Sequence, residues 1–368
     1  MLSTKQKRII FQILPFGIVP AIFSAVHVIL EKGILGNHPV YPSTGNPFDS
    51  NIFVSVVTAF VVGVIIGFLE VFYVNKWFQN RSFYQKIIFK SILYTVAIII
   101  ASAITVALGH AVNQNKSPFS STVWNFVLSF FTNFVFWSII CYYSLAILVS
   151  LFYKEVSDNM GHAVSLNFFT GKYHQPKSEF RVFMFLDMKS STAHAEKLGH
   201  IRYFEMLKDY YDDLSHAILK YGGEIYQYVG DEIVITWKVK KDFAKKALDC
   251  FFDMKLTLSA KDKSYLSKYG FSPKFKAGLH FGKVTTGEIG RLKKDIVFTG
   301  DTLNTTARIQ SLCNQYGAEL LVSEDFTNAI KSKSHYKIQS LGKVQLRGRN
   351  EGIELFRVNK TEHNNLNK

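Results

Sequence analysis

Cysteine is scarce in this chain of 368 residues, which contains only Cys141, Cys250 and Cys313. Three thiols so far apart are too few for a disulfide framework and too scattered for a zinc site. We therefore interpret all three as packing residues.

Acidic residues are also few, because 28 aspartates and glutamates stand against 43 lysines and arginines and leave a net charge of +15. Such an excess is typical of proteins that bind nucleic acid, and also of proteins that face anionic lipid and hold a polyphosphate. The sequence shows no array of basic and aromatic residues and no helix suited to a nucleic-acid groove. We therefore predict no nucleic-acid partner.

Charged residues almost vanish from four long blocks of the first 152 residues, whereas the chain after Lys154 reads as an ordinary globular sequence. The blocks are 9–30, 52–74, 91–109 and 123–152. Each is close to the ~20 apolar residues that a helix needs to cross a bilayer. The first block is too long for the core of a signal peptide, and three further blocks follow it. The sequence thus predicts four transmembrane helices in a lipid bilayer.

The basic residues that flank these blocks predict their orientation. They precede the first block, fill the connection between the second and third, and follow the fourth: Lys5, Lys7, Arg8, Lys76, Arg81, Lys86, Lys90 and Lys154. Because basic loops remain in the cytoplasm, the amino terminus and the carboxy-terminal half are expected there, in a multi-pass protein of the inner or plasma membrane. The outward connections, 37–50 and 113–121, are too short for a sensor domain.

Three polar residues within the apolar blocks are candidates for binding. Glu70 lies inside the second block, where a carboxylate is costly; it is either functional or reaches back toward Lys76 at the membrane surface. His27 and His110 both fall near the outer face, which would permit a haem or metal pair. An ordinary interfacial histidine is the simpler interpretation of each.

The change in composition divides the chain into four parts. They are a four-span membrane domain (1–152), a helical linker (153–178), a charged globular domain (179–360) and a polar tail (361–368). Apolar residues of the linker recur at helical spacing, which fits the start of an amphipathic helix that could pair with a second copy of the chain.

The pattern of the globular domain predicts the order β-α-α-β-β-α-β. We expect strands at 180–187, 224–229, 232–237, 274–281 and 283–288, and helices at 193–198, 201–221 and 243–260. Glycine pairs and turns separate these segments. This order is typical of an α+β sandwich of the ferredoxin-like type.

Two carboxylates lie at strand ends in this prediction. Asp187 ends the first strand, and Asp231 lies in the hairpin between the next two. Adjacent strand ends would bring them together, and paired carboxylates without histidine or cysteine suit magnesium or manganese. Taken singly, one is equally well a turn residue and the other a helix cap.

Three segments containing these residues resemble the signature segments of class III adenylyl and guanylyl cyclases. They are Phe185-Leu186-Asp187 with Ser191-Thr192, then Val229-Gly230-Asp231-Glu232, and Gly300-Asp301-Thr302-Leu303-Asn304-Thr305-Thr306-Ala307-Arg308. The resemblance extends from about Phe180 to Val358 and includes the Gly278–Gly282 strand and the Leu346-Arg347-Gly348 turn. It does not cover the membrane half.

The resemblance implies a reaction and a set of roles. In the family, the ribose 3′-hydroxyl attacks the α-phosphate and pyrophosphate leaves, with two divalent cations, Mg²⁺ or Mn²⁺, held here by Asp187 and Asp231. Asn304 and Arg308, four apart on an expected helix, would orient the ribose and stabilise the transition-state phosphate. Arg347 stands where the family has a triphosphate-binding lysine. The family draws the aspartates and the Asn/Arg pair of one site from different chains, which implies a homodimer.

The positions that choose the purine depart from the family pattern. They are occupied by Gln227 and Val297, which match neither the adenine pair nor the guanine pair. A glutamine amide can bind either purine, and valine offers no polar contact. Asp295, on the same face of the expected strand as Val297, could read the purine amino group, or it is a surface turn residue beside two lysines. We choose ATP because adenylyl cyclases are the commoner bacterial form, with GTP as the alternative.

Two other functions stay open. A diguanylate cyclase shares the ferredoxin-like core and an acidic hairpin, but it lacks the helix with Asn304 and Arg308. A degenerate, cyclase-like membrane receptor would bind nucleotide or dimerise without catalysis. The altered purine pair, Gln227 and Val297, is the feature that favours such a receptor.

Overall fold

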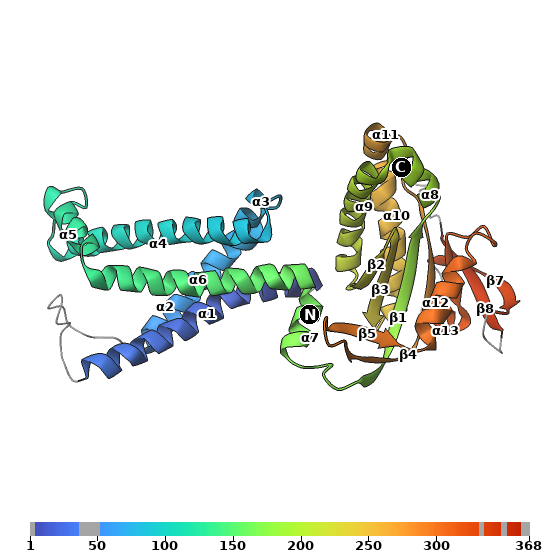
Figure 1. Ribbon diagram of the computed structural model, residues 1–368, viewed down its shortest axis with the longest axis horizontal. Helices are drawn as coiled ribbons and strands as arrows, with labels where there is room; N and C mark the ends of the chain where they lie inside the picture. The colour runs from blue at the N-terminus through green and yellow to red at the C-terminus, as the bar shows by residue number, and fades with distance from the viewer. Residues whose placement is uncertain (1–3, 37–51, 331–334, 347–351, 362–368) are drawn as a thin grey trace. The chain divides into compact units, whose positions relative to one another are not determined.

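The computed structural model describes residues 4–36, 52–330, 335–346 and 352–361. Its contacts divide the chain into two compact units, Gln6–Ser165 and Leu166–Lys368, the first five residues being grouped with the second unit. The division falls inside the predicted linker. Figure 1 shows a unit made of helices and a unit built around a sheet.

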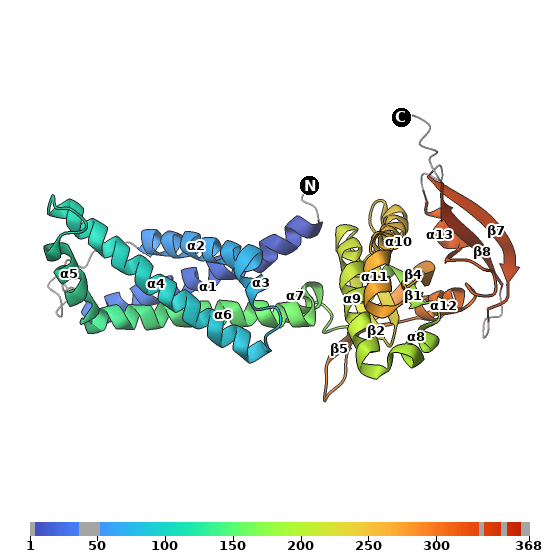
Figure 2. The same cartoon turned by 90° about the horizontal axis from the view of Figure 1, so that it is seen from above.

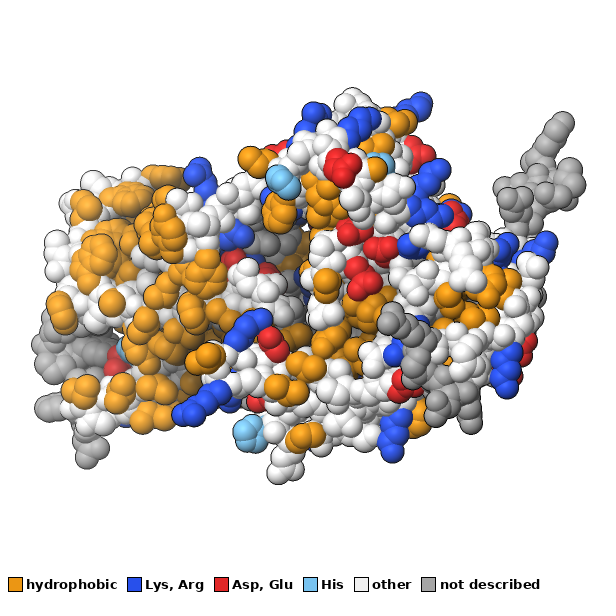
Figure 3. Space-filling view, turned by 45° about the vertical axis from the view of Figure 1, so that its right-hand side comes forward, with side chains coloured by type: hydrophobic (Ala, Val, Ile, Leu, Met, Phe, Trp, Pro, Cys, Tyr) orange, Lys and Arg blue, Asp and Glu red, His pale blue; other side chains and the backbone are white. Residues whose placement is uncertain are grey.

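The described secondary structure of the first unit is helical. Its helices are α1 (Thr4–Leu35), α2 (Ile52–Leu69), the π-helical turn η1 (Glu70–Val74), α3 (Asn75–Trp77), α4 (Phe83–Asn113), α5 (Ser121–Phe131) and α6 (Phe134–Met160). Four stretches are long and apolar enough to cross a membrane: Arg8–Ile34, Ile52–Trp77, Phe83–Val112 and Phe136–Met160. Figure 3 shows hydrophobic side chains over much of the visible surface of these helices. This is the pattern of a multi-pass membrane protein.

The fourth predicted block, 123–152, is not one helix. It is divided into α5, which ends at Phe131, and α6, which begins at Phe134. The hydroxyl of Thr132 donates to the carbonyl of Ser129, and the indole of Trp137 donates to the carbonyl of Phe131. These side chains satisfy backbone oxygens that a continuous helix would have used, so the chain can turn here. The fourth span therefore runs later than predicted.

Helices α1 and α2 approach each other closely at glycines. A Cβ atom on Gly63 would lie 1.9 Å from the carbonyl oxygen of Phe16, and one on Gly67 would lie 2.9 Å from the Cβ of Phe16. Pro20 has no N–H to donate to that same carbonyl of Phe16. Small residues four apart permit such backbone contact between membrane helices.

A buried cluster of charged side chains joins η1, α4 and α6. The Nζ atom of Lys90 (α4) lies 2.6 Å from Glu70 and 2.8 Å from Glu155 (α6), and that of Lys154 (α6) lies 3.2 Å and 3.4 Å from the same two residues. Both lysines also donate to the side-chain oxygen of Asn75, at 2.9 and 2.8 Å. We call Glu70, Lys90, Lys154 and Glu155 the charge cluster. The cluster contains two carboxylates and two ammonium groups, so these four charges sum to zero.

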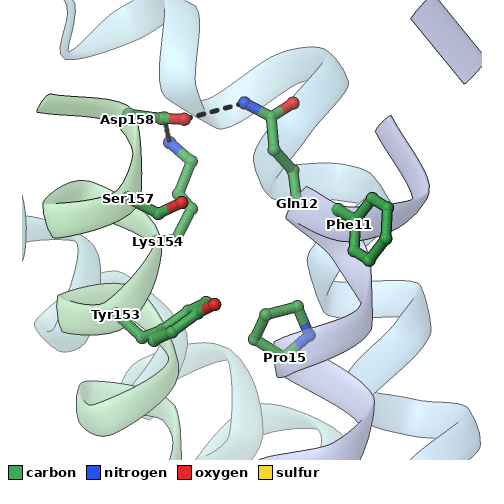
Figure 4. Close-up of a pocket in the computed structure, with 7 residues that line it drawn as sticks. All are labelled: Phe11, Gln12, Pro15, Tyr153, Lys154, Ser157 and Asp158. Carbon is green, nitrogen blue, oxygen red and sulfur yellow. Dashed lines mark hydrogen bonds and ion pairs between the residues drawn. The ribbon is translucent and has the colours of Figure 1, made fainter. Parts of the chain in front are cut away.

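Further contacts tie the charge cluster to α4 and α1. The hydroxyl of Tyr94 donates to Glu70 at 2.9 Å. Lys154 also lies 3.2 Å from Asp158, which accepts a hydrogen bond of 2.8 Å from Gln12 on α1. Figure 4 shows Gln12 facing Asp158 and Lys154 beside a small pocket between α1 and α6. One polar network thus links α1, η1, α4 and α6.

These contacts correct the interpretation of Glu70. Its partners are Lys90 and Lys154, and it is fully buried, so it does not reach toward Lys76 at the surface. The π-helical turn begins at Glu70, and such turns often mark positions where a side chain is redirected.

The two histidines lie in separate surroundings. His27 pairs with Glu31 at 3.5 Å and contacts the ring of Tyr142, whereas His110 stacks on Phe126 with ring centroids 4.0 Å apart. Among the described residues, no group of three or more potential ligands could hold a metal ion.

The second unit is an α+β fold, as predicted. Helix α7 (His162–Phe169) crosses the division between the units. The described helices that follow are α8 (Ser191–Leu198), α9 (His200–Lys220), α10 (Phe243–Ala260), α11 (Asp262–Tyr269), α12 (Asp301–Ser311) and α13 (Glu324–Asn328). Its strands are β1 (Lys177–Met188), β2 (Glu224–Val229), β3 (Glu232–Lys238), β4 (Phe275–Ile289), β5 (Asp295–Thr299), β6 (Leu320–Ser323), β7 (Tyr336–Val344) and β8 (Ile353–Lys360). The sheet order is β2-β3-β1-β4-β6-β8-β7, and β5 pairs with β4.

The central strand β1 is buried on both faces. Val182, Met184 and Leu186 pack with α9 and α10 in one hydrophobic core. Phe183 and Phe185 point the other way and pack with Val284, Phe298 and residues of α12. Figures 1 and 2 show α9 and α10 on one face of the sheet and α12 on the other. Alternation along β1 therefore supplies two cores at once.

The two strands predicted at 274–281 and 283–288 form the single strand β4. Gly282, which suggested a break, lies within it. A Cβ atom on Gly282 would lie 2.6 Å from the Thr302 hydroxyl, and one on Gly278 would lie 2.5 Å from the backbone nitrogen of Gln310. Both glycines therefore allow α12 to lie directly on β4.

The predicted linker helix is interrupted. Helix α6 continues to Met160, and α7 follows after Gly161, whose φ of +83° suits glycine. A glycine in the left-handed conformation commonly ends a helix. The amphipathic pattern of the predicted linker helix is therefore divided between α6 and α7.

We expect that removing one charge from the charge cluster will destabilise the helical unit. In Lys90→Met, Glu70 and Glu155 share the single ammonium of Lys154; in Glu70→Gln, the two lysines lose a carboxylate. Each change should lower the free energy of unfolding by about 3–5 kcal/mol, because a buried charge loses its partner. Thermal unfolding of the purified full chain in detergent measures this.

The double variant Glu70→Gln/Lys90→Met keeps the cluster neutral and should be more stable than either single variant. Lys86→Met is the matched control, since Lys86 is one turn earlier on α4, partly exposed and 4.0 Å from Glu155. It should cost about 1 kcal/mol or less. Equal losses for Lys86→Met and Lys90→Met would contradict the role of the charge cluster.

Candidate active site

Asp187 and Asp231 lie at the same edge of the sheet. Asp187 is the last residue but one of β1, and Asp231 lies in the turn that joins β2 to β3. Because β1 and β3 are antiparallel, with Leu186 opposite Ile233, the end of one strand meets the start of the other. Gly230, with a φ of +61°, allows the tight turn that presents Asp231.

The environment of Asp231 disfavours its negative charge. Burial raises the pKa of its carboxyl, a hydrogen bond from Ser191 lowers it, and the charge of Asp187 raises it further. Its Oδ2 atom is buried and has no hydrogen-bond partner among the described residues. A buried, unpaired carboxylate oxygen beside a second carboxylate is an arrangement that a cation would satisfy.

Asp187 has two partners that the sequence motifs did not indicate. The ammonium of Lys276, directly opposite on β4, lies 3.2 Å from Oδ2, and the amide of Gln310 (α12) donates to the same atom at 3.2 Å. The contact with Lys276 depends on the register between β1 and β4, and the contact with Gln310 depends on how α12 packs against the sheet. The one hint in the sequence is that Gln310 follows Arg308 by two residues on the expected helix.

Two further ionisable groups, Glu232 and Tyr203, lie near the aspartates. The pKa of Glu232 is raised to about 7 by burial and then by the charges of Asp187 and Asp231. Burial and the same two charges raise the pKa of the Tyr203 phenol to about 12. The field at this edge of the sheet is therefore negative and attracts cations.

The donor set fits a hard divalent cation. No three metal-binding side chains cluster within the described part of the chain, so the protein offers two carboxylates at this place. Magnesium is commonly held by one or two carboxylates, with the remaining positions filled by phosphate oxygens and water. A pair of aspartates suits a metal that arrives with a polyphosphate.

Asn304 and Arg308 lie on α12, as the sequence predicted. The side of α12 that faces the sheet is formed by buried residues: Thr302, Thr305, Thr306, Ile309 and Gln310. Asn304 is exposed and Arg308 partly exposed on the other side. Helix α12 thus presents Gln310 to Asp187 of its own chain and turns Asn304 and Arg308 outward.

The purine-reading candidates lie on two strands. Gln227 is exposed on β2 directly after a bulge, and Val297 is partly buried on β5, opposite Gly287. Asp295 is exposed at the start of β5, and its carboxylate lies 2.9 Å from the Lys293 ammonium. That pairing is what a surface turn residue would show. Arg347 lies outside the described residues.

A sequence model of the adenylate and guanylate cyclase catalytic domain matches residues 173–360. The chain belongs to this family. The resemblance seen in the sequence motifs is thereby confirmed, and the match favours a nucleotide cyclase over a diguanylate cyclase. Residues 173–360 are called the cyclase domain below.

Individual relatives agree with the family. "Adenylate cyclase 2" of Rhizobium meliloti is 35% identical over 207 residues, which are 56% of this chain and 57% of the relative. "Adenylate cyclase" of Anabaena cylindrica is 28% identical over 185 residues, 48% of this chain and 36% of the relative. The matched regions thus span little more than half of these relatives, or less.

The fold of the cyclase domain also occurs in a solved structure. A bacterial light-regulated adenylyl cyclase has a TM-score of 0.52 at 21% sequence identity, over 62% of this chain and 66% of that one. At this identity the comparison shows the shared fold.

We expect Asp231→Asn to stabilise the metal-free protein at neutral pH. Since the pKa of Asp231 is raised on folding, its ionised form costs stability above that pKa, and the cost disappears as the pH falls below the ordinary value for aspartate. The gain should be up to about 1 kcal/mol at pH 7, because the group is partly exposed. Thermal unfolding in EDTA at pH 7 and at acid pH measures it.

Asp295→Asn is the matched control, because it removes an exposed carboxylate paired with Lys293. It should bring no gain at either pH. If Asp231→Asn were only as stable as wild type at pH 7, burial and the charge of Asp187 would not disfavour the ionised carboxylate of Asp231.

Proposed function

We propose that this protein is a membrane-anchored adenylyl cyclase that converts ATP to 3′,5′-cyclic AMP and pyrophosphate at a homodimer interface. The observation that carries the proposal is the pair Asp187 and Asp231, one with a buried unpaired oxygen, in a chain of the cyclase family. The names of the relatives support ATP as the substrate.

Asp187 and Asp231 would hold Mg²⁺ or Mn²⁺. When bound, two such ions neutralise the triphosphate and lower the pKa of the attacking hydroxyl. Lys276 and Gln310 hold the carboxylate of Asp187 at the edge of the sheet. Ser191 hydrogen-bonds Asp231 in the same way. These groups orient both carboxylates before substrate arrives, so little reorganisation is needed on binding.

Asn304 and Arg308 would act on substrate held by a second copy of the chain. Their outward position on α12 supports this, because the inner side of the helix is occupied by contacts with the sheet of its own chain. The guanidinium of Arg308 would stabilise charge on the α-phosphate, and the amide of Asn304 would orient the ribose. A two-fold symmetric dimer then carries two equivalent sites. By the family pattern, Arg347 would bind the triphosphate.

The choice of purine would rest mainly on Gln227, whose amide can accept from the adenine amino group and donate to N1. Val297 would contribute shape without a hydrogen bond, and Asp295 is already paired with Lys293. GTP is the alternative substrate, because the same amide, turned over, fits guanine.

The spans would anchor the cyclase domain to the inner or plasma membrane, with the amino terminus and cyclase domain in the cytoplasm. Arg81 in the connection between α3 and α4 supports this orientation, together with Lys76 on α3 and Lys86 on α4, which flank the connection. Basic residues at this place suit anionic lipid headgroups.

A product assay tests the activity. The purified chain with ATP and Mn²⁺ should yield 3′,5′-cyclic AMP, at a higher kcat/KM than it yields cyclic GMP from GTP, and chromatography of the products measures both. Asp187→Asn and Arg308→Ala should each abolish the reaction, because each removes an essential group from both sites of the dimer. A cyclic dinucleotide as product, or wild type no more active than Asp187→Asn, would overturn the proposal.

Mixing the two inactive variants tests the shared site. Half of the dimers in an equal mixture are mixed, and each of these has one intact site, so about a quarter of wild-type activity should return. A site contained in one chain would recover nothing.

A further inference from the structure

Tyr173, which precedes β1, is almost fully buried in the cyclase domain. The guanidinium of Arg181 (β1) donates to its hydroxyl at 3.1 Å, and that hydroxyl lies 3.1 Å from a carboxylate oxygen of Glu179. The backbone carbonyl of Tyr173 accepts a hydrogen bond of 3.0 Å from the N–H of Glu288 on β4. The segment that enters the domain from α7 is therefore fastened to β1 and β4.

Arg181 is a buried hub that connects this segment to two other strands. Its Nε atom donates to Glu179 at 2.9 Å, and its Nη1 atom donates to Glu224 on β2 at 2.8 Å. Its guanidinium carbon lies 4.9 Å from the centre of the Phe298 ring on β5. One planar side chain thus contacts the linker segment, β2 and β5.

Phe298 connects the two strands that carry the purine-reading candidates. Its ring packs edge-on against Tyr226 with centroids 5.0 Å apart. Tyr226 precedes Gln227 on β2, and Phe298 follows Val297 on β5. The position of the Phe298 ring therefore helps to determine how far apart Gln227 and Val297 lie.

We propose that Tyr173 and Arg181 are positioning residues that set the spacing of Gln227 and Val297 and so take part in nucleotide selection. The inference rests on the proposed cyclase function and deepens it. It concerns residues outside the signature segments: one in the entry segment of the domain and one in the middle of β1.

The chemistry of arginine explains why the tyrosine hydroxyl matters. The three hydrogen bonds of the Arg181 guanidinium use Nε, Nη1 and Nη2, each with a different partner. Without the hydroxyl of Tyr173, the Nη2 group loses its partner inside the protein, where an unpaired donor is costly. We then expect the guanidinium to rotate away from the Phe298 ring. As a result, β5 loses a contact that holds it beside β2.

The test compares two buried tyrosines in the full chain. Tyr173→Phe removes the hydroxyl that binds Arg181. Tyr265→Phe is the matched control, because Tyr265 on α11 is equally buried and its hydroxyl donates to Asp213 at 2.8 Å. The affinities for fluorescent ATP and GTP analogues, and kcat/KM for ATP and GTP, are measured for wild type and both variants, together with thermal unfolding.

Both variants should lower the unfolding temperature, since Tyr173→Phe loses the hydrogen bonds to Arg181 and Glu179 and Tyr265→Phe loses the one to Asp213. Only Tyr173→Phe should change the ratio of ATP to GTP, in affinity and in kcat/KM, by about threefold or more. Arg181→Lys keeps the charge but loses the planar fork, and should change the ratio in the same direction and further.

Unchanged ratios in Tyr173→Phe and Arg181→Lys, with lowered stability, would overturn the inference and leave these residues a structural role. A wild-type chain that makes no cyclic nucleotide would instead overturn the proposed function. In that event the analogue affinities still decide whether Tyr173 and Arg181 control nucleotide selection.

Discussion

Charge that is buried away from water needs a partner of opposite charge or a set of hydrogen bonds, and both units are built around this requirement. In the helical unit, Glu70, Lys90, Lys154 and Glu155 pair with one another, and Asn75, Tyr94 and Asp158 supply further contacts. In the cyclase domain, Arg181 spreads its donors over two carboxylates and a phenol. Each arrangement joins elements that are far apart in the chain, so pairing of charge also specifies packing.

The edge of the sheet where Asp231 lies is the place where this pairing is incomplete. Two aspartates and Glu232 lie together, and among the described residues the ammonium of Lys276 contacts Asp187. In the proposed function, cations and substrate phosphates would complete the pairing. If the proposed function holds, this incomplete pairing is a trade of stability for binding, which is common in active sites.

Glycine supports both arrangements by allowing close approach. Gly278 and Gly282 let α12 lie on β4, so that Gln310 reaches Asp187 while Asn304 and Arg308 face outward. Gly63 and Gly67 let α2 meet α1 in the helical unit. Helix α12 thereby relates to two sites: it supports the aspartates of its own chain and, in the proposed homodimer, serves those of its partner.

Local pattern in the sequence was enough for the features that depend on short segments. Runs of apolar residues indicate four spans, alternation and glycine indicate the α+β fold, and the motifs identify Asp187, Asp231, Asn304 and Arg308 as candidates. Errors arose where a local signal has two meanings: Gly282 suggested a turn but permits helix packing, and the block 123–152 hides the turn after Phe131.

The partners of these residues were decided by the tertiary structure alone. Lys276 faces Asp187 because of the register between β1 and β4, and Glu70 meets Lys90 and Lys154 because three helices pack at one level. Tyr173 and Phe298 come together on Arg181 across 125 residues of chain. Composition and periodicity predict whether a segment is a helix, a strand or a membrane span. The distant side chain that pairs with a buried charge is decided only when strands pair and helices pack.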